Sequence, residues 1–384
     1  MSLRVLHCPT GVGGHPQALC RIERAAGLSS RSVVFGVSPV GYIADEEVPR
    51  SGFRFISSEI RRWTLLKEAI RDYDIIHFNF GTSLMPHPDR LLYLKTNWLK
   101  YGFKLIYNIY ARAFELSDLP KLKNAGKKIV VTYQGDDARQ WDYCLDNFRL
   151  THASEVEPVY RRKIQDEGAR KRISEFDRYA DIIYALNPDL LHVLPTRAQF
   201  FPYAHPNIDE WQFCGVEVNT NRPLRIIHAP SNPLVKGTRF IEEAVAILKQ
   251  EGLSFEYIKI EGMTNNEARI IYEQADVLVD QLLCGWYGGL SAELMALGKP
   301  VVCYIRDQDL HFLPDEMAQN LPIIKADPDT ITSVLRRLIT APRNDLAEAG
   351  RRCRAFVERW HNPIAIGGRV RSDYEAVMRT HKGP

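Results

Sequence analysis

The stretch CGWYGGLSAELMALGKPVVCYI, residues 284–305, could bind a ligand through bare backbone and one carboxylate. Part of it is explained by structure alone. Ser291 suits the N-cap of a short helix, and Glu293 complements the helix dipole in the first turn. Gly298 and Pro300 would then end the helix. The loop before the helix mixes glycines with two aromatic residues, and a ligand pressed against the backbone would explain that composition.

A second candidate anion site is the segment 226–248, which is predicted to form a strand, a polar loop and a helix. A loop that leads from a parallel strand into a helix offers N–H groups and the positive end of the helix dipole to an anion. Lys236 adds a point charge that suits a phosphate. The alternative is a surface loop with one solvated lysine. The spacing is not that of a P-loop.

Another glycine loop, TGVGGHP at residues 10–16, follows the first predicted strand. Gly11, Gly13 and Gly14 permit close backbone approach to a ligand. Their spacing differs from the dinucleotide fingerprint, and a plain tight turn is the alternative. His15 comes directly after the loop, so it is the histidine that we expect to be functional.

The segment 129–140 ends a predicted strand with Gln134, Asp136, Asp137 and Arg139. Acids beside an arginine at the carboxyl end of a strand could orient sugar hydroxyls or act as a base. They could equally cap the next helix and pair with Arg139. The residues alone leave both interpretations open.

Two series of strands and helices must position these loops. The first half alternates predicted strands with helical stretches, and the strand-like runs are RVLHCP, RSVVFGVS, FRFIS, DIIHFNFG, KIVVTYQG, DIIYALN and AQFFPYA. The second series contains LRIIHAP, FEYIKIEG, DVLVDQL, PVVCYI and PIIKA. This alternation is typical of parallel sheets covered by helices. We predict an α/β protein with two Rossmann-like doubly wound domains facing across a cleft.

The predicted domain limits follow from changes in pattern. Residues 1–205 form the first Rossmann-like domain, and 206–223, which lack periodicity, form a linker. Residues 224–360 form the second domain, and 361–384 form a C-terminal helix.

Composition indicates an ordinary globular protein. The 384 residues are 45% hydrophobic and 25% charged. No run is apolar enough for a membrane span or a signal peptide, so we expect a cytoplasmic protein. The seven cysteines are widely spaced, which argues against a zinc site or a disulfide framework. A net charge of +3 does not suggest nucleic acid as a partner.

The charge is unevenly distributed. Residues 90–128 contain nine Lys or Arg against two Asp or Glu, a balance of 9 − 2 = +7. Apolar and aromatic residues are interleaved with the basic ones. This pattern suits peripheral contact with the inner face of a membrane, or a lipid-linked acceptor. The alternative is a helix with one buried face and one solvated basic face.

Taken together, these loops resemble those of the GT-B glycosyltransferases, especially the retaining family 4. The most specific part is the segment from Gly288 to Val302, which is similar to the family's glycine loop, glutamate-bearing helix and Gly-Lys-Pro turn. The final helix, around Val370–Met378, resembles the one that crosses back to the first domain in that family.

The resemblance implies roles for residues at matching positions. Glu293 would accept hydrogen bonds from the ribose of a nucleotide sugar, and Lys236 would neutralise the diphosphate. Backbone groups of the two glycine loops would add further contacts. The candidate donor-binding residues are Lys236, Glu293, Gly288, Gly289, Leu290, Ser231, Asn232 and Tyr287, together with the loop glycines Gly11, Gly13 and Gly14. The candidate catalytic residues are Asp136, Gln134 and His15.

The chain departs from the family pattern at three places. Gly285 stands where the first glutamate of the Glu-x7-Glu pattern is expected. Ser231, Asn232 and Pro233 replace the arginine that usually precedes the lysine. Gln134 takes the place of a histidine near the sugar.

The expected activity is transfer of a sugar from a nucleotide-diphosphate donor to a hydroxyl of a glycan or lipid-linked acceptor. We expect retention of configuration, a role in polysaccharide or glycoconjugate biosynthesis, and no metal or cofactor. The alternatives are a nucleotide-sugar epimerase of the same fold and a non-catalytic nucleotide-sugar or glycan-binding partner in a polysaccharide assembly complex. A dehydrogenase is disfavoured because the dinucleotide fingerprint is absent.

Overall fold

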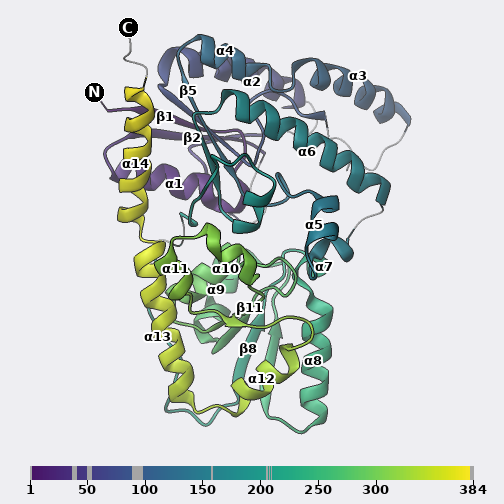
Figure 1. The fold of residues 1–384 in the computed structure, drawn as a ribbon, viewed down its shortest axis with the longest axis vertical. Helices are drawn as coiled ribbons and strands as arrows, with labels where there is room; N and C mark the ends of the chain where they lie inside the picture. Colours follow the sequence, from purple (N-terminus) through teal and green to yellow (C-terminus); the bar gives the residue numbers. More distant parts are fainter. Residues whose placement is uncertain are drawn as a thin grey trace.

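Two parallel sheets, one in each half of the chain, organise the protein (Figure 1). The computed structural model describes residues 2–36, 41–49, 54–88, 98–156, 159–204, 206, 208 and 210–380. In this part of the chain the first sheet has the order β3-β2-β1-β4-β5-β6-β7. Its strands are β1 (Arg4–Cys8), β2 (Ser29–Phe35), β3 (Glu46–Val48), β4 (Ile75–Asn79), β5 (Lys128–Tyr133), β6 (Ile182–Ala185) and β7 (Gln199–Phe200).

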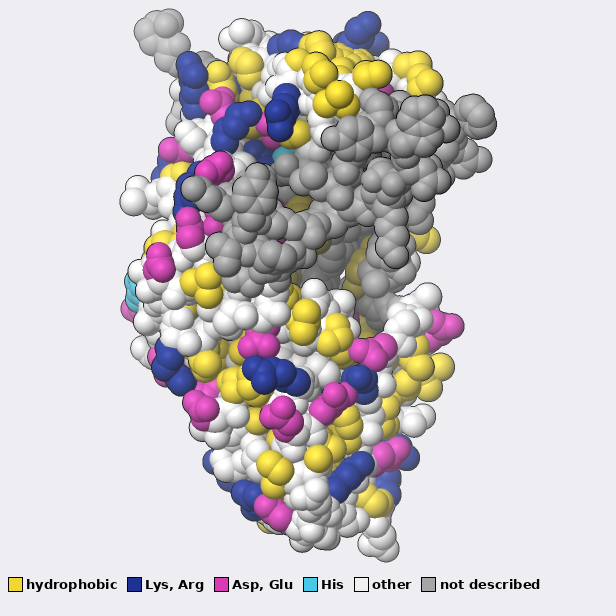
Figure 2. Space-filling model, turned by 90° about the vertical axis from the view of Figure 1, so that its right-hand side faces the viewer, with side chains coloured by type: hydrophobic (Ala, Val, Ile, Leu, Met, Phe, Trp, Pro, Cys, Tyr) yellow, Lys and Arg dark blue, Asp and Glu magenta, His cyan; other side chains and the backbone are white. Residues whose placement is uncertain are grey.

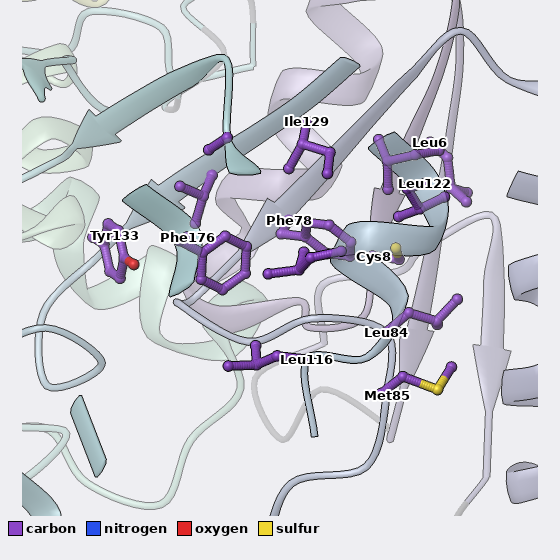
Figure 3. Close-up of a cluster of buried hydrophobic side chains, with 14 of the residues drawn as sticks. Leu6, Cys8, Phe78, Leu84, Met85, Leu116, Leu122, Ile129, Tyr133 and Phe176 are labelled. Carbon is purple, nitrogen blue, oxygen red and sulfur yellow. The ribbon is translucent and has the colours of Figure 1, made fainter. Parts of the chain in front are cut away.

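The helices of the first half cover both faces of this sheet. They are α1 (His15–Ala25), α2 (Arg54–Asp72), α3 (Trp98–Phe114), α4 (Asp118–Asn124), α5 (Trp141–Asn147) and α6 (Val159–Tyr179). Strands β4 and β5 are buried along their whole length, as expected for parallel strands with helices on both sides. Successive residues alternate between the faces: Val5 packs towards α1, and Leu6 packs towards α2 and α4. Figure 3 shows the α2 and α4 side of this core.

The second sheet has the order β12-β11-β10-β8-β9 among the described residues. Its strands are β8 (Leu224–His228), β9 (Phe255–Lys259), β10 (Val277–Val279), β11 (Val301–Cys303) and β12 (Ile324–Lys325). The helices around it are α7 (Pro233–Lys236), α8 (Thr238–Gln250), α9 (Asn265–Gln274), α10 (Gly289–Ala296), α11 (Asp315–Gln319), α12 (Ile331–Thr340) and α13 (Arg343–Trp360). The five strands predicted for this half are confirmed.

Helices of the second half follow the expected amphipathic pattern. In α8 the buried apolar residues are Ile241, Ala244, Val245 and Leu248, spaced so that they form one stripe. This stripe packs on one face of the sheet together with α12, whereas α9, α10 and α13 pack on the other.

The last helix, α14 (Pro363–Arg379), returns to the first half and packs against α1 (Figure 1). Pro363 sits at its first position, where a missing N–H costs nothing. Ile366, Val370 and Tyr374 are buried in the core beneath α1. The final helix thus lies against the first half of the chain.

One predicted strand is wrong. The run FRFIS was expected to be extended, but from Arg54 onwards it belongs to α2. The buried residues Ser58, Arg62, Leu65 and Ala69 recur at helical spacing over a much longer window than the five residues considered.

Two further findings concern the membrane. None of the described helices combines enough length and apolar character to cross a bilayer. Of the basic region expected to contact a membrane surface, residues 90–97 lie outside the described part of the chain.

Candidate functional site

The strand order reverses between β1 and β4 in the first sheet and between β8 and β10 in the second. Loops that leave such neighbouring strands diverge, which opens a crevice at the carboxyl ends of the strands. The glycine loop after β1, the segment around Lys236 after β8, and the glycine-aromatic loop after β10 all occupy these positions. The fold therefore brings the predicted loops to two facing crevices.

Lys236 is fixed at both its backbone and its side chain. Its carbonyl accepts a hydrogen bond from the Leu282 N–H, and its ammonium lies 2.6 Å from Asp280 Oδ1 at the end of β10. Burial opposes both charges. Even so, their mutual attraction raises the pKa of Lys236 and lowers the pKa of Asp280, so both remain ionised. A β-carbon on Gly288 would lie 3.4 Å from Lys236 Nζ, so the ammonium lies against bare backbone.

Asp280 also sets the start of α10. Its Oδ2 accepts hydrogen bonds from the Gly288 N–H at 2.8 Å and the Ser291 hydroxyl at 2.7 Å. The expectation that Ser291 is the N-cap is wrong, because the helix begins at Gly289 with Gly288 as its cap. Glu293 is consequently in the second turn. The first N–H groups of α10 lie beside the Lys236 ammonium, an arrangement that suits an anion.

Glu293 meets the first half of the chain through Tyr42. The Tyr42 hydroxyl lies 3.4 Å from Glu293 Oε1, and its ring packs so closely on Gly14 that a β-carbon there would come within 2.6 Å. A β-carbon on Gly13 would lie 3.8 Å from Gln134 Oε1. The structure thus gathers the first glycine loop, Gln134 and Glu293 around one opening.

A side chain at Gly285 would be strained in this fold. Its φ is +82°, and a β-carbon would lie 2.6 Å from Arg306 Nη1. The Arg306 guanidinium bonds Asp309 at 2.9 Å and stacks 3.6 Å from the centre of the Phe148 ring. A buried arginine therefore lies beside the position where the resemblance expected a carboxylate.

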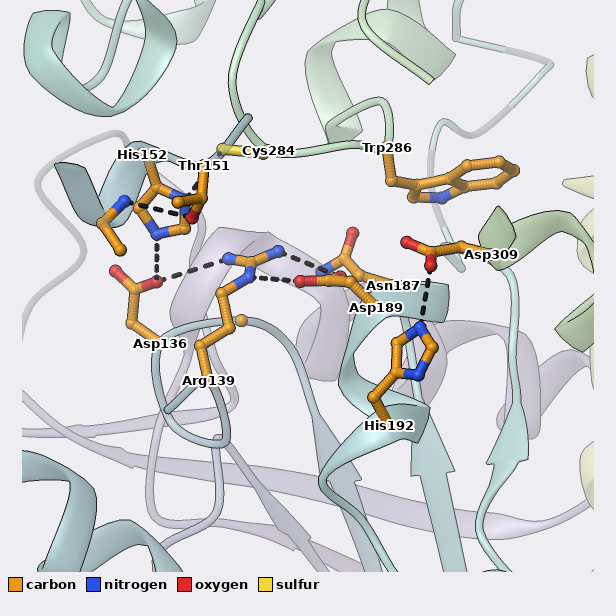
Figure 4. A network of polar contacts seen from close by, with 12 residues as sticks. Asp136, Arg139, Thr151, His152, Asn187, Asp189, His192, Cys284, Trp286 and Asp309 are labelled. Carbon is orange, nitrogen blue, oxygen red and sulfur yellow. Dashed lines mark hydrogen bonds and ion pairs between the residues drawn. The ribbon is translucent and has the colours of Figure 1, made fainter. Parts of the chain in front are cut away.

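A polar network joins the two halves beside this loop (Figure 4). Arg139 bonds Asp189 at 2.7 Å and Asp136 at 3.3 Å. His152 lies between two partners. Its Nε2 is 3.7 Å from Asp136 Oδ1, and its Nδ1 is 3.7 Å from Cys284 Sγ. Because Cys284 belongs to the second half and the others to the first, the network crosses the cleft.

Burial and charge act against each other in this network. Burial disfavours the His152 imidazolium, but Cys284 and Asp136 outweigh burial and raise the pKa of His152 to about 9. Burial disfavours the Cys284 thiolate, but His152 and Arg139 hold its pKa below the usual value. The side chain of Asp136 is half exposed, and His152 and Arg139 lower its pKa. His152 therefore carries a positive charge at neutral pH and lies inside the network that crosses the cleft.

Asp137 has a different role from Asp136. Its carboxylate accepts hydrogen bonds from the N–H groups of Gln134 and Gly135, at 3.0 and 2.6 Å. Burial raises the pKa of Asp137 to about 6 in spite of these bonds. Asp137 therefore binds the backbone just before it, and the first N–H groups of α5 bond Asp166 instead. Of the two acids, Asp136 is the one that pairs with Arg139 and faces the cleft.

A cavity of about 620 Å³ lies between the two halves next to this network. Its lining combines the rings of Phe80 and Trp141 with polar side chains of the first half and residues of α7. The lining residues are Phe80, Thr82, His87, Asp136, Asp137, Arg139, Trp141, Val156, Gln165, Arg172, Asn232, Leu234 and Val235. Aromatic faces beside hydroxyl, amide and carboxylate groups suit a sugar ring.

Two predicted residues are not placed to touch a ligand in the cleft. His15 is fully buried, and its Nδ1 accepts a hydrogen bond from the Ala204 N–H. Tyr287 is also fully buried, and its hydroxyl lies 2.8 Å from His361 Nε2. The side-chain roles predicted for both are therefore corrected to packing and internal hydrogen bonding.

The remaining predicted residues lie at the cleft or near it. The Asn232 side chain caps α7 by accepting hydrogen bonds from Leu234 and Val235, and Ser231 before it is exposed. Gly289 and Leu290, both half-buried, form the first turn of α10. Gly11 precedes the short helical turn Val12–Gly14.

The residues of the site that were not predicted include Asp280, His152, Cys284 and Arg306. The position of Asp280 directly after a buried strand was a usable signal, as it was for Asp136. His152 and Cys284 are 132 residues apart in the sequence, and no local pattern predicts their contact.

Among the described residues, one cluster has the composition and spacing of a metal site: His7, Glu23 and His77. It lies beneath α14 in the first half, where the Tyr374 hydroxyl donates to Glu23 and bonds His77. These side chains already satisfy one another by hydrogen bonds, so the cluster is explained as a polar core.

No protein-family model matches the sequence, and a search of curated proteins finds no match. Solved structures are similar in fold over almost the whole chain. The catalytic domain of starch synthase IV from Arabidopsis thaliana, bound to ADP and acarbose, superposes with a TM-score of 0.58 at 12% identity, covering 99% of this chain and 100% of that one. HepE from Anabaena, in complex with UDP-glucose, gives 0.57 at 10% identity, covering 98% and 100%.

Sucrose-phosphate synthase from Thermosynechococcus elongatus gives a TM-score of 0.54 at 14% identity, covering 99% of this chain and 100% of that one. At such low identities the likeness establishes the fold. The chain has the GT-B fold, as the sequence predicted.

Proposed function

We propose that this protein is a glycosyltransferase that moves a sugar from a nucleotide-diphosphate donor to a hydroxyl of a glycan or lipid-linked acceptor. The observation that carries the proposal is the Lys236 ammonium held against Gly288 and the start of α10, across the cleft from the first glycine loop. Solved structures of the same fold that hold UDP-glucose or ADP support a nucleotide-sugar donor.

In this proposal the second half binds the donor. The diphosphate takes its charge compensation from Lys236 and from the N–H groups of Gly289 and Leu290 at the start of α10. Glu293 accepts hydrogen bonds from the ribose hydroxyls. Asp280 is the positioning residue, because it orients Lys236 and the Gly288 N–H at the same time.

The acceptor occupies the 620 Å³ cavity in this proposal. The rings of Phe80 and Trp141 contact the apolar face of a sugar, and Asp136 accepts hydrogen bonds from its hydroxyls. The acceptor oxygen bonds to the anomeric carbon as the bond from that carbon to the diphosphate oxygen breaks. With retention, the acceptor proton passes to the departing diphosphate, and positioning supplies most of the rate.

A turnover assay with a panel of UDP-, ADP- and GDP-sugars, with and without glycan acceptors, tests this function. We expect acceptor-dependent release of nucleoside diphosphate with at least one donor, and no effect of EDTA. Lys236→Ala and Glu293→Ala should each lower kcat/KM by about a hundredfold, because each removes a charged contact to the donor. Lys249→Ala, on the exposed side of α8, is the matched control.

The same assay distinguishes the other functions. Isomerised donor without an acceptor would identify an epimerase, and binding without turnover would identify a non-catalytic partner. Wild-type turnover in both site variants would contradict the proposed donor site. A role in polysaccharide or glycoconjugate biosynthesis follows only if the productive acceptor is a glycan or a lipid-linked sugar.

A further inference from the structure

Two neighbouring helices of the first half expose large aliphatic side chains. On α3, Leu105, Ile106 and Ile109 are 55%, 68% and 63% exposed. On α2, Ile56 and Ile60 are 66% and 61% exposed. We call these five residues the aliphatic face. Several large exposed aliphatic side chains on neighbouring helices of a globular protein usually mark an interaction site.

Aromatic residues beneath this face connect α2 with α3. The Trp63 Nε1–H of α2 donates to the Tyr110 hydroxyl of α3 at 2.9 Å, and the Trp63 ring meets Phe114 edge-on at 5.2 Å between centroids. The inner side of α3 buries Tyr107 and Ala111. Helix α3 is therefore apolar both on its inner side and at exposed positions, whereas an ordinary surface helix has a polar outer face.

The charged residues of α3 are all basic. Its sequence WLKYGFKLIYNIYARAF contains Lys100, Lys104 and Arg112 and no Asp or Glu, and Arg112 is exposed. Figure 2, which looks at the side of the molecule that carries α3, shows hydrophobic side chains gathered at its upper end with Lys or Arg beside them. Aliphatic side chains on a helix whose charges are all positive match the boundary between anionic headgroups and acyl chains.

We propose that the aliphatic face docks on an anionic lipid bilayer. The aliphatic side chains enter the headgroup boundary, and the exposed Arg112 remains at the level of the lipid phosphates. A second copy of the chain fits this face less well, because α2 and α3 together carry 5 + 3 = 8 Lys or Arg against three Asp or Glu, and a symmetric contact would bring this excess of positive charge together. The proposal does not depend on the proposed function.

Co-sedimentation of the full chain with vesicles tests the proposal. We expect binding to vesicles of phosphatidylcholine with phosphatidylglycerol, weakened by raising NaCl because exposed charges are screened. Vesicles of phosphatidylcholine alone should bind at least tenfold more weakly. The double variant Ile106→Asp with Ile109→Asp should lose at least tenfold of the binding to anionic vesicles.

Two matched controls are available. Ile364→Asp on α14 and Ile270→Asp on α9 place the same charge on isoleucines that are 85% and 63% exposed outside the aliphatic face. Both should bind vesicles like the wild type, and unfolding curves verify that all variants are folded. Absent wild-type binding at low salt, equal loss in the controls, or a concentration-dependent dimer that the double variant abolishes would each overturn the proposal.

Discussion

Gly285 is the residue at which this chain differs most clearly from the pattern that its loops resemble. Its φ is +82°, and the Arg306 guanidinium would lie 2.6 Å from any β-carbon at this position, so any other residue would be strained and would displace Arg306. In the proposed function, contacts to the transferred sugar at this point come from backbone atoms or from neighbours such as His152. The departure is accommodated by the surrounding structure and is not a simple loss of one carboxylate.

Gly285→Ala should destabilise the protein by about 1–3 kcal/mol, because the methyl group forces a strained backbone and displaces Arg306. Urea unfolding measures the effect. Gly368→Ala is the matched control, since a β-carbon there meets nothing within 4 Å. Equal stability of Gly285→Ala and wild type would contradict the described packing of Arg306.

At this scale the sequence indicated only part of the site. Lys236 and Glu293 were found because they follow strands or glycine loops. The role of Arg306 could not be predicted from the sequence. It depends on the contacts of its guanidinium with Gly285 and Phe148, which only the folded chain creates. Tyr287 was assigned to the ligand on composition, although its ring is buried in the core.

The junction between α13 and α14 holds a histidine that makes stability depend on pH. Fully buried His361 lies 2.8 Å from the Tyr287 hydroxyl and 3.0 Å from the Tyr203 carbonyl oxygen. Burial lowers the pKa of His361 to about 4 from 6.5. The unfolded chain therefore binds more protons than the folded protein between these two values, so stability is complete above pH 6.5 and falls as the pH drops towards 4.

This difference predicts a loss of about 3 kcal/mol from His361 alone between pH 7 and pH 4. His361→Gln keeps a hydrogen-bonding side chain and removes the titration. We expect its unfolding free energy to change less steeply over this range, as measured by urea unfolding at several pH values. Parallel slopes in the two proteins would show that His361 is not neutral and buried as described.

The Tyr374 hydroxyl of α14 bonds both helix α1 and the first sheet. Tyr374 donates to Glu23 Oε1 at 2.8 Å and lies 2.7 Å from His77 Nδ1. Tyr374→Phe leaves both buried groups without this partner and should cost about 1–3 kcal/mol. Unfolding curves of Tyr257→Phe provide the control, because no described residue bonds that buried hydroxyl. Equal effects of the two substitutions would contradict the role of Tyr374.

At the level of elements, the sequence predicted most strands and the last helices correctly. The limits of α8 were clear because an apolar stripe and Gly237 define them. The start of α10 was misplaced because Asp280, a residue outside the helix, binds Ser291 and the Gly288 N–H. Local capping rules cannot anticipate a partner supplied by the preceding strand.

For the whole molecule, the two halves meet through aromatic contacts such as Phe200 with Trp286 and through ion pairs at the surface. Arg239 pairs with Glu155 at 3.0 Å and Arg149 with Asp327 at 2.9 Å, in both cases with an exposed arginine. Such interfaces permit domains to move relative to one another. We therefore expect donor binding to change how the halves sit across the cleft.

The two-sheet architecture could be predicted because it repeats a simple alternation of strands and helices. The arrangement of residues at the cleft could not be predicted in this way. Tyr42 and Glu293 are 251 residues apart, and only the folded chain brings them to the same opening. The contact of His152 with Cys284 could not be predicted for the same reason, because 132 positions separate these residues in the sequence.

Calorimetric titration of nucleoside diphosphates and nucleotide sugars into the full chain tests the central claim most directly. We predict binding of one donor per chain, weakened at least tenfold, or by about 1.4 kcal/mol, in Lys236→Ala, and unchanged in Lys249→Ala. Absence of binding by every nucleotide sugar, or equal affinity in Lys236→Ala and wild type, would contradict this claim.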